Sequence, residues 1–265
     1  MAVAERFQGA NVIGAGRLSP YWGEHAARYF FALPLVENKS VLDIACGTGY
    51  GIALLKSAAK HVTGVDVDPQ AAREALAECD DRAAVLLANG LGLPFADGAF
   101  DAITSFETLE HLHERGKFLA ELHRVLRPDG KLILSTPNAN YTMSVNGKPS
   151  NPFHIFEYAP SELREELERY FSVKRFLGQT LDGSIIIPPF FDAQRRLPKD
   201  IVTRGRLFGW KVMNKVPFRI RERLSDTIWG KPFYPTESDY VFSTETVERA
   251  PVVVAVCSKK GFGLR

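Results

Sequence analysis

The sequence predicts an α/β protein in which a parallel sheet is covered by helices. Between residues 41 and 137, short runs rich in β-branched and apolar residues alternate with segments of helical periodicity, the order that builds a parallel sheet. The chain has 265 residues, 45% of them hydrophobic, so it can bury a core without disulfides or structural metal. Its three cysteines form no C-x-x-C pair, which argues against a zinc site and favours a reducing cytoplasm.

The elements follow one another regularly up to residue 137. The predicted strands are 41–45, 61–66, 83–88, 100–105 and 131–136, and the predicted helices are 50–60, 69–78 and 117–126. The last helix has apolar residues at the i, i+3, i+4 and i+7 positions of an amphipathic helix. The segment 127–130 (RPDG) ends this helix in a turn, because proline and glycine favour turns.

Beyond residue 137 the pattern loosens. A helix at 160–170, opened by Pro160 and a candidate N-cap at Ser161, precedes a strand at 171–177, and a strong last strand covers 252–257. More than 70 residues separate these two strands, far more than an ordinary connection of about 4–6 residues. We expect a single domain with four parts. These are N-terminal cap helices (1–37), a core (38–179), an inserted basic substrate cap (180–245) and the final strand (246–265).

The net charge of +2 conceals an uneven distribution. Residues 1–140 contain 13 Lys/Arg and 17 Asp/Glu, whereas residues 141–265 contain 20 and 14. The stretch 195–223 holds 10 basic residues interleaved with apolar and aromatic ones. This mixture suits binding to an anionic substrate, to a membrane surface or, least favoured, to nucleic acid. The alternative is a helical cap whose charged residues are merely solvated.

A glycine-rich loop follows the first predicted strand, in the run DIACGTGYG (43–51). Glycines there let the backbone turn tightly and let a ligand approach the main chain. A dinucleotide fingerprint would need a third glycine at position 52, where the chain has Ile52. Asp43 stands four residues before Gly47, an acid that suits a ligand with an ammonium group. Asp66 ends the second strand, where a carboxylate can bind both hydroxyls of a ribose.

Four ordered runs together carry a family resemblance: VLDIACGTGYG, GVDVDP, LPFADGAFDAITSFETLEHL and ELHRVLRPDGKLILSTPN. Over residues 38–138 the chain resembles class I S-adenosylmethionine-dependent methyltransferases of the methyltransferase-11-like, small-molecule and glycan type. The resemblance implies a doubly wound, mostly parallel seven-stranded sheet whose last strand is antiparallel. It also implies that S-adenosyl-L-methionine binds across the carboxyl ends of the first strands.

The resemblance assigns cofactor roles residue by residue. Asp43, Gly47 and Gly49 match the loop around the methionine part, Asp66 matches the ribose-binding acid, and Val67 is expected to pack against adenine. Asn89, followed by Gly90, replaces the usual Asp that meets the adenine amino group. Phe106 matches the position beside the sulfonium. Arg28 is expected to meet the methionine carboxylate. Ala45 replaces a more usual glycine, a change expected to be neutral.

Two histidines are candidates for the chemistry. His111 follows the fourth strand and His154 follows the fifth, in the run NPFHIFEY (151–158), so both open toward the expected acceptor side. A histidine near neutral pH is the commonest general base for a hydroxyl acceptor. The alternative for each is a hydrogen-bonded loop residue. His61 and His123 are expected to be structural or surface residues, and His113 is expected to be solvated.

The resulting expectation is a methyltransferase acting on an oxygen of a small-molecule, sugar or glycan acceptor, with anionic and lipid-linked acceptors included. The alternatives are an N-methyltransferase, a quinone-type O-methyltransferase, or a partner protein that binds S-adenosylmethionine without catalysis. A cytoplasmic location, with contact to the inner membrane surface through 195–223 left open, fits a chain without an apolar run of membrane-spanning length or a signal layout at its start. The oligomeric state stays open.

Overall fold

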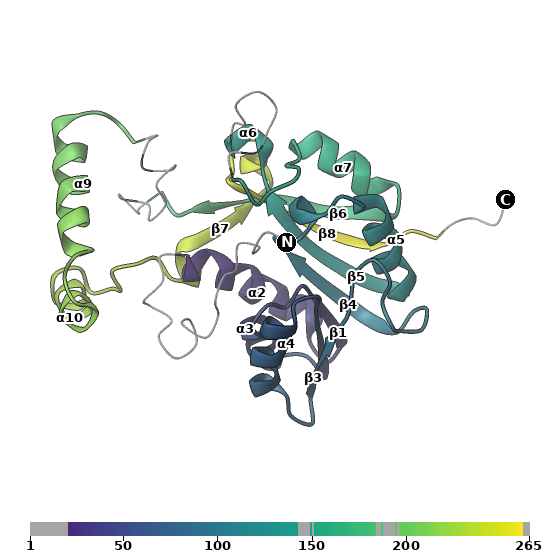
Figure 1. Ribbon diagram of the computed structural model, residues 1–265. Helices are drawn as coiled ribbons and strands as arrows, with labels where there is room; N and C mark the ends of the chain where they lie inside the picture. Colours follow the sequence, from purple (N-terminus) through teal and green to yellow (C-terminus); the bar gives the residue numbers. More distant parts are fainter. Residues whose placement is uncertain are drawn as a thin grey trace. The chain divides into compact units, whose positions relative to one another are not determined.

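The computed structural model describes residues 21–142, 149, 151–183, 187, 194 and 197–261. Its sheet has eight strands in the order β3-β2-β1-β4-β5-β8-β6-β7 (Figure 1). The strands are β1 Ser40–Ile44, β2 His61–Asp66, β3 Ala83–Leu87, β4 Phe100–Phe106, β5 Leu126–Pro137, β6 Phe171–Leu181, β7 Tyr240–Ser243 and β8 Val252–Lys259. The first five strands pair in parallel, and β8 runs antiparallel to both β5 and β6. The predicted doubly wound, mostly parallel sheet with an antiparallel last strand is confirmed.

The sheet has one strand more than the seven that the sequence predicts. β7 has four residues and lies between two short 3-10 helices, η4 Glu237–Asp239 and η5 Thr244–Thr246. It extends the sheet beside β6. A run this short shows too little alternation for sequence periodicity to separate a strand from a loop.

The described helices flank the strands and join them. They are α2 Trp22–Val36, α3 Tyr50–Leu55, α4 Pro69–Ala75, α5 Arg115–Val125, α6 Ala139–Thr142, α7 Pro160–Glu168, α9 Ile201–Met213 and α10 Phe218–Trp229, with 3-10 turns η1 Leu76–Glu78 and η2 Leu109–His111. Asp68 caps α4 by accepting hydrogen bonds from the backbone N–H groups of Gln70 and Ala71.

Several element boundaries differ from the sequence prediction. The helix expected to reach residue 60 ends at Leu55. The expected turn at 127–130 belongs to β5, because Leu126 already pairs with Phe100 and the register then shifts before Ala102 meets Lys131. The N-cap of α7 is Ala159 rather than Ser161, since Pro160 takes the first helical position and the Glu162 carboxylate accepts the Ala159 N–H at 2.9 Å.

Alternating side chains along the strands supply two buried faces. Leu42 and Ile44 of β1 belong to a cluster that includes residues of α5 and α7, so these helices cover one face of the sheet. Asp43, between them, points to the opposite face and meets Tyr29 of α2. On that face a Cβ at Gly64 would lie 2.4 Å from Ile52 of α3, which shows how closely this helix packs on β2.

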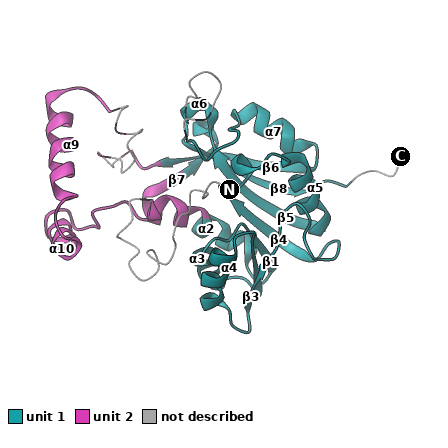
Figure 2. Cartoon of the chain, in the orientation of Figure 1, with its two compact units in different colours: residues 1–9, 29–180, 242–265 teal, residues 10–28, 181–241 magenta. Residues whose placement is uncertain are grey.

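The chain divides into two compact units (Figure 2). The first unit consists of the described residues within 29–180 and 242–261, and it includes strands β1 to β5 and β8. The second unit consists of the described residues within 21–28 and 181–241, and it includes α9 and α10. Among the described residues, no helix has both the length and the hydrophobicity needed to span a bilayer.

Candidate functional site

A cavity lies at the carboxyl ends of β1, β2 and β3. The parallel register pairs Ile44 with Val65 and Asp66 with Leu87, so the strands end nearly level and the loops that follow them meet. The residues around the cavity are Ile44, Ala45, Val65, Asp66, Val67, Ala88, Asn89, Gly90, Leu91, Thr108, Leu112 and Phe118. Four predicted cofactor residues (66, 67, 89 and 90) therefore share one cavity, at the edge where open α/β sheets bind ligands.

The Asp66 carboxylate joins the glycine loop to the turn after β2. Its Oδ2 accepts the backbone N–H of Gly47 at 2.8 Å, and its Oδ1 accepts that of Asp68 at 2.8 Å. These two hydrogen bonds fix the orientation of the carboxylate at the wall of the cavity. The role of Asp66 in binding ribose stays a prediction.

Three residues of the glycine loop, Ala45, Gly47 and Gly49, have left-handed backbone geometry. Gly49 has a φ of 89°, and a Cβ there would lie 2.9 Å from the Cα of Ala75 in α4. Glycine is therefore required both by conformation and by close packing. Ala45 has a φ of 57°, a left-handed conformation that costs an L-residue with a Cβ about 1 kcal/mol. The replacement of glycine by Ala45 is thus a strained substitution, not the neutral one that the sequence suggested.

Asp43 is completely buried beneath the glycine loop. Its Oδ1 accepts the hydroxyl of Thr104 at 2.6 Å, and the hydroxyl of Tyr29 lies 3.3 Å from both carboxylate oxygens. Burial raises the pKa of Asp43 to about 7, against the opposing effect of these two hydrogen bonds, and the nearby charge of Asp66 raises it further. The site can therefore hold a proton or accept a cation near neutral pH.

The residues predicted to lie near adenine line the cavity. Val67 leaves 69% of its area exposed, an apolar surface that a flat ring would cover. Asn89 is exposed, and its side-chain oxygen accepts the N–H of Leu91 at 2.9 Å, which leaves one lone pair for a ligand. Gly90 packs closely on Phe118, since a Cβ would lie 2.8 Å from that ring.

Phe106 and Arg28 are both buried. Phe106 ends β4, its ring meets that of Tyr29 edge-on at 4.9 Å, and its carbonyl accepts the Thr108 hydroxyl. Phe106 is not among the residues that line the cavity. Arg28 lies on α2, in the second unit, with 1% of its surface exposed. Their roles beside the sulfonium and the methionine carboxylate stay predictions.

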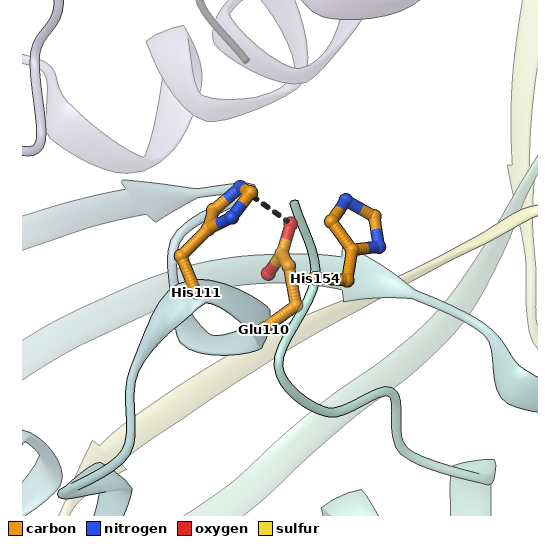
Figure 3. Close-up of side chains that lie close together, drawn as sticks. All are labelled: Glu110, His111 and His154. Carbon is orange, nitrogen blue, oxygen red and sulfur yellow. Dashed lines mark ion pairs between the residues drawn. The ribbon is translucent and has the colours of Figure 1, made fainter. Parts of the chain in front are cut away.

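His111 and His154 are brought together from different loops. His111 ends η2, after β4, and His154 lies in the segment after β5. Their rings are 5.0 Å apart between centroids and nearly perpendicular (Figure 3). The side chain of His111 is 26% exposed and that of His154 is 10% exposed. Two loops separated by 42 residues therefore present a pair of imidazoles.

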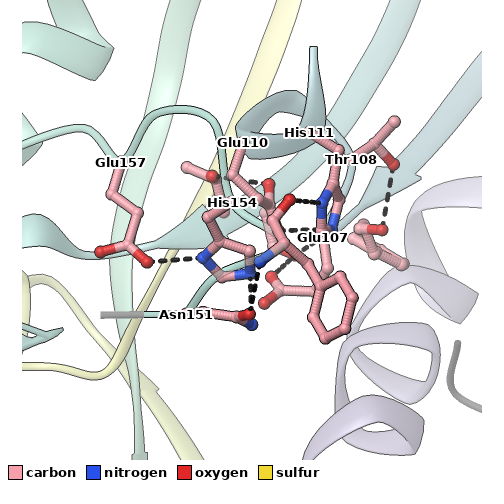
Figure 4. A network of polar contacts seen from close by, with 11 residues as sticks. Glu107, Thr108, Glu110, His111, Asn151, His154 and Glu157 are labelled. Atoms are coloured by element: carbon pink, nitrogen blue, oxygen red, sulfur yellow. Dashed lines mark hydrogen bonds and ion pairs between the residues drawn. The ribbon is translucent and has the colours of Figure 1, made fainter. Parts of the chain in front are cut away.

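Hydrogen bonds define which nitrogen of each ring is basic (Figure 4). The Nδ1 of His111 lies 3.0 Å from the carbonyl oxygen of Phe153 and must donate to it. The Asn151 amide oxygen accepts the N–H of Phe153, which turns its NH₂ group toward the Nε2 of His154 at 3.0 Å. Because an NH₂ group only donates, Nε2 accepts, and the Nδ1–H of His154 donates to Glu157 at 2.5 Å. These contacts assign the lone pair of each ring in its neutral form to Nε2.

The remaining predicted histidines have other surroundings. His61 and His113 are exposed, as expected for surface residues. His123 is buried on α5, its Nε2 lies 2.9 Å from the Lys260 carbonyl, and burial lowers its pKa. None of these three lines the cavity.

Several partners of the predicted residues escaped sequence reasoning. Tyr29 and Thr104 surround Asp43, but they come from α2 and β4, so only the fold brings them to it. Glu157 lies three residues after His154 and forms a hydrogen bond with its ring. The short spacing between a histidine and an acid was the sequence signal that could have indicated this pair. Glu110, completely buried beside His111, also went unremarked, although the two are adjacent in the chain.

The basic residues of the predicted cap divide into two groups. Arg221 is buried, with its guanidinium 4.6 Å from the ring centroid of Tyr234 and 4.9 Å from that of Phe233, so it supports the structure of the second unit. The exposed basic residues of α9, α10 and their connection are Arg204, Arg206, Lys211, Lys215, Arg219 and Arg223. Arg195 and Arg196 lie outside the described residues.

Comparisons with known proteins agree with this geometry. Residues 42–134 match the model of a methyltransferase domain family. A Mycolicibacterium smegmatis protein named as an S-adenosylmethionine-dependent methyltransferase is 34% identical over 160 residues, 60% of this chain and 62% of that protein. The O-methyltransferase rstn1 of Aspergillus nomiae is 32% identical over 109 residues, 39% of this chain and 48% of the relative. The chain thus spans about half to three-fifths of these relatives.

A solved structure shows the same fold over the whole chain. One chain of the complex between the Haloferax volcanii Trm112 methyltransferase activator and a methyltransferase aligns with a TM-score of 0.61, covering 100% of both chains at 19% identity. At this identity the similarity concerns the fold alone.

Proposed function

Since the chain carries a class I S-adenosylmethionine-dependent methyltransferase domain, we propose that it transfers a methyl group to an oxygen of a small-molecule, sugar or glycan/lipid-linked acceptor. The observation that carries this proposal is that His111 and His154 lie together after β4 and β5, at the same carboxyl edge of the sheet as the cavity, although neither lines it. The O-methyltransferase named among the relatives favours oxygen over nitrogen.

The chain's residues suit each part of S-adenosyl-L-methionine. Asp66 ends β2 in the wall of the cavity, where a carboxylate can bind ribose hydroxyls, and exposed Val67 offers an apolar surface for adenine. Asn89 and Gly90 border the adenine end of the cavity. The methionine end is proposed to meet Asp43, Gly47 and Gly49, with Arg28 at its carboxylate and Phe106 near the sulfonium.

The bound cofactor supplies an activated methyl carbon that a nucleophilic oxygen displaces in line from a sulfonium. The protein then needs to position the acceptor, exclude water and receive the hydroxyl proton. His154 is suited to receive it once the acceptor hydroxyl takes the place of the Asn151 amide that now donates to Nε2 at 3.0 Å, because the Glu157 carboxylate then stabilises the resulting imidazolium through Nδ1–H. Thr142 donates to Glu157 and fixes that carboxylate.

The first test compares ligands and then products. Calorimetry should detect binding of S-adenosylmethionine and none of NAD, and a panel of hydroxylated acceptors should then yield S-adenosylhomocysteine. With a responsive acceptor, His154→Gln should lower kcat by about 100-fold while the exposed His113→Gln leaves it unchanged. Binding of the cofactor with no turnover on any hydroxyl, amine or quinol acceptor would favour a partner protein that does not catalyse.

Residues 180–245 are proposed to select the acceptor. The exposed basic residues on α9 and α10 favour phosphate or carboxylate groups on the acceptor, and the apolar residues between them favour a lipid-linked intermediate. Reversing the charges of Arg204, Arg206 and Lys211 should raise KM for an anionic acceptor without changing cofactor affinity. Unaltered methylation of that acceptor would contradict this role.

A further inference from the structure

Beside the two histidines lies a third potential metal ligand. Glu110, His111 and His154 each offer one ligand atom, and these atoms lie within 4.8 Å of one another (Figure 3). The Nε2 of His111 is 3.9 Å from Oε1 of Glu110. Two neighbouring residues of η2 and one from the segment after β5 therefore form a group of two imidazoles and one carboxylate.

Both imidazoles already have the arrangement of metal-binding histidines. Each donates its Nδ1–H to an oxygen, His111 to the Phe153 carbonyl and His154 to the Glu157 carboxylate (Figure 4). In metal sites this second bond fixes the tautomer and makes the other nitrogen a better ligand. The amide of Asn151 now donates to the Nε2 of His154 at 3.0 Å, so an ion would take the place of this hydrogen bond.

The carboxylate of Glu110 is held in place from two sides. It is completely buried, and its Oε2 accepts the hydroxyl of Thr136 at 2.9 Å. The backbone carbonyl of Glu110 accepts the N–H groups of Ile155 and Phe156, which attaches the segment carrying His154 directly to Glu110. Burial strengthens the attraction between this carboxylate and a divalent cation, because the surroundings screen charges less than water does.

We propose that Glu110, His111 and His154 bind one divalent transition-metal ion, such as Zn²⁺, Mn²⁺, Co²⁺ or Fe²⁺. Imidazole and carboxylate ligands suit these ions, whereas Mg²⁺ and Ca²⁺ prefer oxygen ligands alone. Ligand atoms bound about 2.1 Å from one ion lie about 3.0–3.4 Å apart, so ligand atoms now within 4.8 Å of one another must approach by up to about 1.8 Å. Three protein ligands leave coordination positions for an acceptor oxygen.

The catalytic role of the ion rests on the methyl transfer proposed above, but its binding does not. The acceptor hydroxyl coordinates the ion and releases its proton to water. Its oxygen then forms the new bond to the methyl carbon while the carbon–sulfur bond breaks and its electron pair stays on sulfur. With the ion bound, both imidazoles are ligands, and metal coordination replaces His154 as the means of ionising the hydroxyl.

The binding test uses the full chain after treatment with a chelator. Titration with Co²⁺ alone should produce visible ligand-field absorption that saturates at one ion per chain, and calorimetry should show Zn²⁺ binding at least about 100-fold more tightly than Mg²⁺. His111→Ala, His154→Ala and Glu110→Gln should each weaken Co²⁺ binding by about 100-fold, and Glu157→Gln by about 10-fold or more. The exposed neighbours His113→Ala and Glu114→Gln should leave it unchanged.

Affinity for S-adenosylmethionine serves as the folding control. It should stay constant in every variant that folds, so a variant that loses it is set aside as misfolded. Saturable Co²⁺ binding that survives in both Glu110→Gln and His111→Ala, or the absence of any stoichiometric binding, would overturn the metal site. A protein that methylates an acceptor equally well after chelation would retain the proposed function without the metal. Specific Co²⁺ binding with no methylation of any acceptor would retain the metal site and contradict the proposed function.

Discussion

The sheet edge in the first unit and helix α9 in the second place their side chains in opposite surroundings. At the sheet edge, charged groups are enclosed, and Asp43 and Glu110 expose none of their surface. Helix α9 buries no residue, and it exposes 86% of Ile201 and 70% of Phe208. The first region has the enclosed polar groups of a chemical site. The second exposes apolar side chains to solvent.

The largest expected difference concerns packing. Leu122 on α5 is completely buried in the core cluster, so Leu122→Ala should lower the free energy of unfolding by about 3 kcal/mol. Ile201→Ala on α9 should change it by less than about 0.5 kcal/mol. Chemical denaturation of both variants measures the difference. A large loss from Ile201→Ala would show that α9 is covered in solution, for example by a second copy of the chain.

A second prediction concerns the cofactor. Asp66→Ala removes the acceptor that holds the N–H groups of Gly47 and Asp68, together with the proposed ribose contact. Affinity for S-adenosylmethionine should fall by about 100-fold, the loss expected for two charge-assisted hydrogen bonds. Calorimetry measures it, and Asp80→Ala, at an exposed position paired with Lys56, is the control. An unchanged affinity would contradict the assignment of Asp66 to ribose.

The third prediction follows from the raised pKa of Asp43, which is about 7. If the cofactor ammonium pairs with ionised Asp43, affinity for S-adenosylmethionine should fall about tenfold for each pH unit below 7 and level off above it. Asp43→Asn should remove this dependence. In the free protein the same raised pKa lowers stability as the pH rises from 3.8 to about 7, because the unfolded chain releases the proton more readily. Cofactor titrations between pH 5.5 and 8 measure the effect. An affinity that does not change with pH would contradict the contact between Asp43 and the cofactor ammonium.

The smallest effect is expected at Ala45. Its positive φ suits glycine, so Ala45→Gly should raise the free energy of unfolding by about 0.5–1 kcal/mol, after the greater entropy of glycine in the unfolded chain is set against the relieved strain. Thermal denaturation measures this. A destabilised variant would show that the loop tolerates the left-handed alanine without strain.

Local signals were sufficient for the cofactor edge. The strand–helix alternation predicts seven of the eight strands, and Asp66, placed by the sequence at the end of the second strand, accepts the N–H of Gly47 at 2.8 Å. These signals work because a parallel sheet brings the ends of successive strands to one edge, whatever their distance in sequence. The short strand β7 and the early start of β5 carry no comparable local signal.

The amino-acid sequence by itself determined the fold class and the glycine loop, and it identified His111 and His154 as candidates. Only the tertiary structure decided that Glu110 joins these histidines, that Tyr29 and Thr104 enclose Asp43, and that Arg221 is buried among aromatic rings. The physical reason is that periodicity and glycine spacing act over a few residues. A polar side chain acquires its role from partners that the packing of distant segments places within hydrogen-bonding distance.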